Sequence, residues 1–144
     1  MAQIRLDGLD AVDAMFKDIG EIPFDVTAEA LDAMATVAEK KVRASGEAMG
    51  VRDPESSVHI LDKITHTRPK KTDSGGYADV TFSGTRTRGR TRTRNAEIAF
   101  INEYGKRNQP ARPFIRTAAE TGGDQIAEPG EKIVGDWFEK AARG

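Results

Sequence analysis

An alanine-rich segment, residues 27–50 (TAEALDAMATVAEKKVRASGEAMG), constrains the fold more than any other part of the chain. It is rich in strong helix formers, and its apolar side chains recur at spacings that place them on one stripe of a helix. We predict Thr27 as the N-cap and an end near Gly46 or Gly50. Its small side chains would let a sheet or a second helix approach closely. The predicted stripe consists of Leu31, Met34, Val42 and either Val37 or Ala38.

The composition limits the core that such a helix can help to build. Hydrophobic residues make up 38% of the 144 residues and aromatic residues only 6%, so aliphatic side chains must fill most of the core. A chain of this length fits one domain, residues 1–144, which we expect to be marginally stable alone. The sequence contains no cysteine, which excludes disulfides, thiolate ligands and thiol nucleophiles within it.

Further helices are predicted towards both ends of the chain. Residues 8–19 carry apolar side chains at helical spacing, and Gly20 is predicted to end that helix. A C-terminal helix is predicted to start at Pro113, with interruptions at residues 122–123 (Gly-Gly) and Pro129. The apolar stripe of its last part consists of Ile133, Val134, Trp137 and Phe138.

A small antiparallel sheet is predicted between these helices. Residues 77–83 alternate apolar and polar side chains, as a half-buried strand does, and we expect them to pair with residues 64–69. Residues 58–64 are predicted as a short helical segment that leads into a strand, while residues 96–104 fit either a strand or a short helix. The predicted fold class is α+β, with N-terminal helices packed on the sheet, a long hairpin loop and a C-terminal helix. The residues of 96–104 that we expect in the core are Ile98, Phe100 and Ile101.

Residues 84–95 are predicted as an extended basic loop, because TRTRGRTRTR (85–94) has an arginine at every second position. In an extended chain rising about 3.3 Å per residue, these arginines would all point one way over about 30 Å. One interpretation is a solvated hairpin tip whose charges keep a strand edge soluble. The other is a salt-dependent contact with a polyanion or a partner ring. The candidate contact residues are Arg86, Arg88, Arg90, Arg92, Arg94, Lys70 and Lys71.

The formal net charge of -1 conceals an asymmetry along the chain. Residues 1–67 carry 7 Lys and Arg against 13 Asp and Glu, whereas residues 68–95 carry 8 against 2. This favours docking of the basic middle of one copy onto the acidic part of another, or onto a polyanion. Tyr77 and Phe82 are the only aromatic residues near the strip, which disfavours a base-stacking platform.

The sequence assembles no catalytic set. His59 and His66 lie seven positions apart without an HExxH motif, so we expect surface or hinge positions rather than a metal pair. We therefore expect no enzyme activity, no catalytic residue, no cofactor and no metal site. The N-terminus lacks a signal-peptide pattern and no apolar run reaches membrane-spanning length, so we expect synthesis in the cytoplasm and no membrane partner.

The most informative stretch is residues 96–120, AEIAFINEYGKRNQPARPFIRTAAE. An apolar segment ends in Glu-Tyr-Gly, a polar loop follows, and Ala-Arg-Pro-Phe begins a helix with proline in its first turn. This combination resembles small neck and tail-completion proteins of long-tailed bacteriophages, and the order of the predicted elements resembles them too. The residues that carry the resemblance are Glu103, Tyr104, Gly105, Ala111, Arg112, Pro113, Phe114 and Ala118.

The resemblance implies a structural virion protein without catalytic residues, which forms a ring, commonly a hexamer, at the head-tail junction. Its partners would be further copies of itself, adjoining head-completion proteins, and tail-tube or tail-terminator proteins. It also implies localisation in the virion after synthesis in the cytoplasm of a bacterial host. The sequence departs from the family pattern in its more basic loop and in the interruptions of its last helix.

A ring would concentrate the arginines of every copy, about thirty if six copies assemble, into one circle of charge. We expect this circle to face either DNA in the channel or the acidic surface of an adjoining ring. A further hypothesis pairs Glu103 with Arg112, within or between subunits, because the two charges flank one short loop. The alternative function is a free-standing nucleic-acid-binding module that uses the arginine strip as a basic arm.

Overall fold

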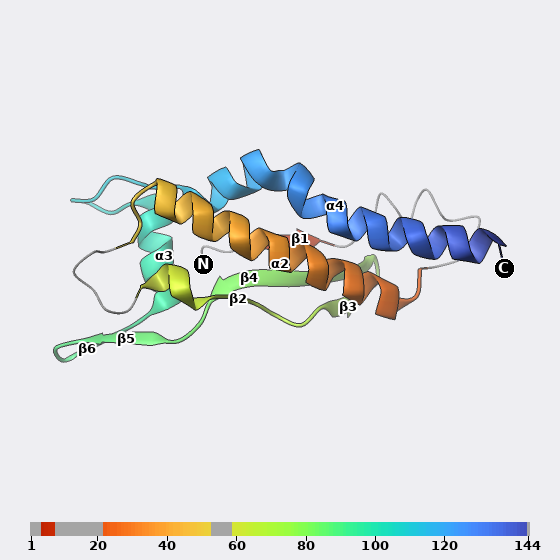
Figure 1. Cartoon of the computed structure of the whole chain (residues 1–144). Helices are drawn as coiled ribbons and strands as arrows, with labels where there is room; N and C mark the ends of the chain where they lie inside the picture. Colours follow the sequence, from red (N-terminus) through yellow and green to blue (C-terminus); the bar gives the residue numbers. More distant parts are fainter. Residues whose placement is uncertain (1–3, 8–21, 53–58, 144) are drawn as a thin grey trace.

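The computed structural model of the chain describes residues 4–7, 22–52 and 59–143 (Figure 1). The helix predicted over residues 8–19 lies outside these ranges. The fold is α+β, with helices packed on a small antiparallel sheet, a hairpin and a C-terminal helix, as predicted. In chain order the elements are β1 (Ile4–Asp7), α2 (Phe24–Ala48), the 3-10 helix η2 (Ile60–Lys63), β2 (Ile64–His66), β3 (Lys70–Thr72), β4 (Gly75–Phe82), β5 (Thr85–Arg88), β6 (Thr91–Arg94), α3 (Asn95–Tyr104) and α4 (Phe114–Arg143).

Strand β4 is the centre of the main sheet because it pairs along both edges. β1 lies antiparallel along one edge, and β2 and β3 follow one another along the other. The predicted pairing is confirmed at β2, where Ile64 lies opposite Phe82 and His66 opposite Val80. The predicted alternation is confirmed as well, since every second residue of β4 is buried. Residues 70–72, beyond the segment 64–69 that we expected to pair, extend the sheet as β3.

Helix α2 packs on β4 and also along α4 (Figure 1). It begins at Phe24 with Pro23 as its N-cap, so the prediction of Thr27 as N-cap is wrong. The main-chain carbonyl of Pro23 accepts a hydrogen bond from the N–H of Thr27 (3.2 Å), and the Thr27 side chain is buried inside the helix. In the apolar stripe Ala38 is fully buried and Val37 only partly, so the smaller side chain faces the core.

Helix α4 continues through residues 122–123 and Pro129, so the predicted interruptions are wrong. Its ribbon changes direction partway along but remains helical (Figure 1). Every fourth residue along one face of α4 is buried. The packing of this face against α2 outweighs the low helix propensity of glycine. A Cβ added to Gly130 would collide with the sulfur of Met34 in α2, so glycine permits this close approach. The buried positions of this face are Gly122, Ile126, Gly130 and Val134.

The core contains few large side chains, as the composition requires. Phe114, at the start of α4, is fully buried and meets Phe82 edge-on, with ring centroids 5.9 Å apart. Leu31 of α2 and Leu61 of η2 are also fully buried in the same cluster. Residues from α2, η2, β4 and α4 therefore meet in one hydrophobic core.

Residues 96–104, for which the sequence fits either a strand or a short helix, form helix α3. The prediction that Phe100 lies in the core is wrong, because its side chain is 45% exposed. The buried face of α3 is centred near Ala99, and Phe100 points about 100° away from that residue, so its ring lies at the edge of the buried face. Ile98 is partly buried against the core.

Candidate functional site

The arginine strip folds back on itself, so the prediction of one continuous cationic face is wrong. β5 and β6 pair antiparallel, with Arg86 opposite Thr93 and Arg92 opposite Thr87. Residues directly opposite one another share a face of a two-stranded sheet, and neighbours along a strand alternate between faces. Arg86 therefore lies on one face of the hairpin, while Arg92 and Arg94 lie on the other.

The hairpin projects from the body of the molecule (Figure 1). Among the described strands, β5 and β6 pair only with each other and not with the main sheet. Arg88 lies opposite Thr91 in the register, and the exposed Arg90 lies in the turn between the strands. The geometry matches the solvated-hairpin interpretation, while a contact with a polyanion or a partner ring stays a prediction.

Contacts at its root fix the direction of the hairpin. Asn95 is buried, and its main-chain N–H donates to the carbonyl of Gly84 (3.0 Å). The side-chain amide of Asn95 donates to the carbonyl of Ser83 (2.8 Å), and Arg94 donates to Glu97 of α3 (3.3 Å). The end of β4 and the start of α3 are thereby joined, so the hairpin leaves the body from a defined base.

Lys70 and Lys71 lie away from the arginines. They belong to β3, which pairs with residues 75–77 at the start of β4, whereas the hairpin follows the end of β4 at Phe82. Five to seven residues of extended chain lie between the part of β4 that pairs with β3 and the end of β4, which corresponds to roughly 20 Å. The structure therefore does not bring the two lysines into the arginine surface.

Arg86 of the hairpin lies near three cationic residues from outside the strip. Arg52, Arg86, Lys106 and Arg112 line one hollow, although they come from three separate segments of the chain. We call the hairpin (85–94), the α3–α4 connection (105–113) and residues 49–52 together the basic end. Sequence reasoning missed Lys106 as a site residue, although its position directly after the Glu-Tyr-Gly signature was an available signal.

Glu103 of the signature is a buried carboxylate that caps helix α4. Its Oε2 accepts a hydrogen bond from the N–H of Ile115 (2.8 Å), and its Oε1 accepts one from the N–H of Arg116 (3.0 Å). The first N–H groups of a helix have no partner within the helix, and a negative charge there is stabilised by the helix dipole. Glu103 therefore joins the end of α3 to the start of α4.

The predicted pairing of Glu103 with Arg112 within one subunit is wrong. Both oxygens of Glu103 accept main-chain hydrogen bonds at the start of α4. The guanidinium of Arg112 instead donates to the carbonyl of Gly50, beyond the end of α2 (3.0 Å). Both charges find main-chain partners, which a search of the sequence for opposite charges does not reveal.

The remaining signature residues shape the joint between α3 and α4. Gly105 has a φ of 78°, and a Cβ placed there would lie 2.8 Å from main-chain atoms of Gln109 and Ala111. The carbonyl of Pro113 accepts a hydrogen bond from the N–H of Thr117 (2.9 Å) in the first turn of α4, directly before the buried Phe114. Most of the signature therefore supports the fold rather than forming a contact surface.

Tyr104 is the exception, because its side chain is 64% exposed. It lies one helical turn after Phe100, and the two rings are in contact with centroids 4.8 Å apart. Exposed aromatic side chains of this kind are enriched at protein interfaces. The two rings form an exposed aromatic pair on α3, the helix that begins where the hairpin ends.

Replacing Glu103 with alanine is expected to lower the free energy of unfolding by about 2–3 kcal/mol, because two main-chain N–H groups lose a charged acceptor. Urea unfolding followed by circular dichroism measures this change. Glu120→Ala is the matched control, since Glu120 is exposed on the same helix. Equal effects of the two substitutions would contradict the capping role.

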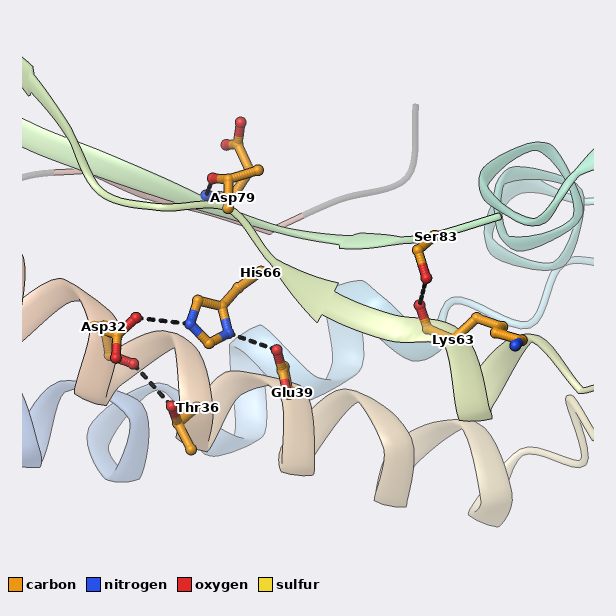
Figure 2. A network of polar contacts seen from close by, with 8 residues as sticks. Asp32, Thr36, Glu39, Lys63, His66, Asp79 and Ser83 are labelled. Carbon is orange, nitrogen blue, oxygen red and sulfur yellow. Dashed lines mark hydrogen bonds and ion pairs between the residues drawn. The ribbon is translucent and has the colours of Figure 1, made fainter. Parts of the chain in front are cut away.

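His66 forms a second polar cluster, with two carboxylates of α2 (Figure 2). Its Nδ1 lies 2.5 Å from Glu39 and its Nε2 lies 2.8 Å from Asp32. Both ring nitrogens can donate only when the imidazole is protonated. Burial lowers the pKa of His66, but the hydrogen bonds to Glu39 and Asp32 outweigh burial and raise it above 6.5. The cluster links β2 to α2, and it could not be predicted from local sequence patterns because 27 and 34 positions separate the partners.

His66→Gln is expected to destabilise the protein by about 1–2 kcal/mol at pH 6, where the charged hydrogen bonds are present. Because the pKa is raised on folding, this stabilisation is complete below the unfolded value near 6.5 and is lost as the pH rises through the folded value. The difference between the native protein and the variant should therefore shrink between pH 6 and pH 9 in urea unfolding. A difference that does not change with pH would contradict a charged cluster.

Within the ranges that the structure describes, no three His, Asp or Glu side chains are grouped to hold a metal ion. None of the described helices is long and apolar enough to cross a membrane. Comparisons of the chain with protein-family models, with curated proteins and with solved structures found no match.

Proposed function

We propose that this chain is a structural virion protein of the phage head-tail interface, a neck, tail-completion or tail-terminator subunit. In this proposal several copies, commonly six in such rings, close around the DNA channel and join the DNA-filled head to the tail. The partners are further copies of the chain and the adjoining head-completion and tail-tube or terminator proteins. The role is one of assembly and requires no catalytic residue and no cofactor.

The observation that carries the proposal is the projecting basic end. The hairpin leaves the body from a fixed root, its strands pair only with each other among the described strands, and its register places arginines on both faces. An arm of this kind adds little to the core of its own subunit and is well placed to reach a neighbour. With arginines on both faces, it could contact two surfaces at once, such as an adjacent subunit and the channel or the next ring.

The geometry of the signature supports the same role. Glu103 and Gly105 fix the direction in which the α3–α4 connection leaves the body, and that connection is the second projecting part of the basic end. The exposed pair Phe100 and Tyr104 adds an aromatic surface to the helix between the two. Aromatic side chains and arginines are enriched at protein interfaces.

The concentration of cations at one end also suits the rival function, a free-standing nucleic-acid-binding module. The mass of the purified protein in solution, measured by light scattering with and without DNA, separates the two. A ring subunit should assemble into a closed oligomer, visible by electron microscopy, either alone or with its neighbouring ring protein. A protein that stays monomeric with its ring partners, yet binds a DNA duplex with a steep salt dependence, would be the rival module.

A further inference from the structure

The hollow at the basic end has a volume of about 560 Å³. It lies between the segment that follows α2, the base of the hairpin and the α3–α4 connection. We propose that this hollow binds a short acidic peptide segment of a partner protein, with carboxylates against its cations and an apolar side chain against its wall. The volume lies within the range of pockets that hold small molecules, so it suits a few residues of an extended peptide.

The cations of the hollow come from separate segments and differ in how they are held. Arg52 is fixed by hydrogen bonds to Asp62 (3.0 and 3.2 Å) and Glu47 (2.7 Å), and these bonds raise its pKa. Arg112 is positioned by the carbonyl of Gly50. The side chain of Lys106 is exposed and carries its charge to the rim. Because Glu47 and Asp62 compensate the charge of Arg52, the positive charge that the hollow offers an anion comes mainly from Arg112 and Lys106, and the fixed position of Arg112 reduces the cost of binding.

The rest of the lining favours a peptide over a nucleic-acid backbone. Ile60, Ile98 and Pro110 give the hollow an apolar wall, which a phosphodiester chain has no side group to fill. The Nε2 of Gln109 donates to the Oδ1 of Asn102 (3.4 Å), and the second N–H and the oxygen of the Gln109 amide can hydrogen-bond a peptide main chain. A hollow of this kind admits a side chain, whereas the convex backbone of a duplex would meet only its rim.

One imidazole in the lining has a buried ring nitrogen for which the described residues offer no hydrogen-bond partner. The Nδ1 of His59 is buried and accepts or donates no hydrogen bond within the part of the chain that the structure describes. A buried polar atom without a partner costs free energy, and most such atoms in proteins are paired. His59 lines the hollow, so its imidazole is a candidate hydrogen-bond donor to a carboxylate bound there.

The test titrates the isotope-labelled full chain with the peptide acetyl-Gly-Glu-Leu-Asp-Ile-Glu-Gly-amide and follows the backbone amide resonances by NMR. The resonances of residues around the hollow, in the ranges 50–52, 98–102 and 106–112, should shift and saturate. Lys106→Glu should weaken the binding by about tenfold, because it replaces an attractive charge with a repulsive one. The same reversal at the exposed Lys140, in the last turns of α4, is the control and should change the affinity less than twofold.

Two further probes identify the ligand class. A peptide with Gln and Asn in place of its acidic residues should bind far more weakly, and a 20-base-pair duplex should leave the resonances of Ile60 and Ile98 unshifted. The proposal is overturned if the acidic peptide shifts no resonance of the hollow, if the neutral peptide binds equally well, or if the duplex binds in its place. The proposed site does not require a ring: a chain that stays monomeric even with its ring partners, yet binds the acidic peptide, would refute the proposed function and leave this site standing.

Discussion

Reversing three charges at the tip of the hairpin, by Arg88→Glu, Arg90→Glu and Arg92→Glu, is expected to leave heads and tails unjoined. The proposed role places these residues where the subunit meets DNA or a neighbouring ring, so replacing three positive charges with three negative ones in every copy would turn attraction into repulsion. We expect the yield of infectious particles to fall by at least about a hundredfold, since a cooperative ring multiplies the defect of each subunit. Complementation of a deletion with the variant, followed by electron microscopy of the lysate, measures both.

The matched control reverses three charges elsewhere on the surface. Lys132, Lys140 and Arg143 are exposed on α4, and changing all three to Glu alters the net charge equally. This control should keep near-normal particle yield, because its residues lie outside the basic end. Normal infectious particles from the hairpin variant would count against a contact with DNA and against a contact with a partner ring.

Phe114→Ala is expected to lower the free energy of unfolding by about 3–5 kcal/mol, the largest effect on stability that we predict. The ring is fully buried and packs edge-on against Phe82, so its removal leaves a cavity where α4 meets the sheet. A core with few aromatic residues has little else to fill that space. For a small domain with a marginal core, a loss of this size removes much of the net stability.

Phe100→Ala is the matched control, because it removes the same ring from a side chain that is 45% exposed. We expect it to cost less than about 1 kcal/mol. Urea unfolding of both variants, compared with the native chain, gives the two values directly. Similar losses for the two substitutions would contradict the placement of Phe114 as the main aromatic residue of the core.

The periodic spacing of apolar residues along the sequence correctly predicted two elements, one strand and one helix. The alternation in residues 77–83 identified β4, and the apolar stripe of residues 27–50 identified α2. Boundaries were less predictable: Pro23 starts α2 although Thr27 has the better N-cap side chain. The continuity of α4 through Pro129 could not be predicted, because packing against α2 supplies the stabilisation that local propensity lacks.

The candidate site was predicted only in part, for two physical reasons. The alternating arginines were visible, but which face each occupies depends on the turn between β5 and β6, which divides them between two faces. Side-chain contacts to the main chain could not be predicted from the sequence, because the partners of Glu103 are backbone N–H groups, which every residue except proline carries. The hollow was also missed, since the topology brings Arg52 and Lys106 together from positions far apart in the sequence.

The most direct test of the account is the number of copies of this chain in intact virus particles, measured by quantitative mass spectrometry of purified virions. We predict that intact particles retain the chain at a small fixed number of copies, consistent with one ring. Heads and tails that have been separated from the junction should no longer contain it. A chain that is absent from purified particles, and monomeric in solution, would contradict the account.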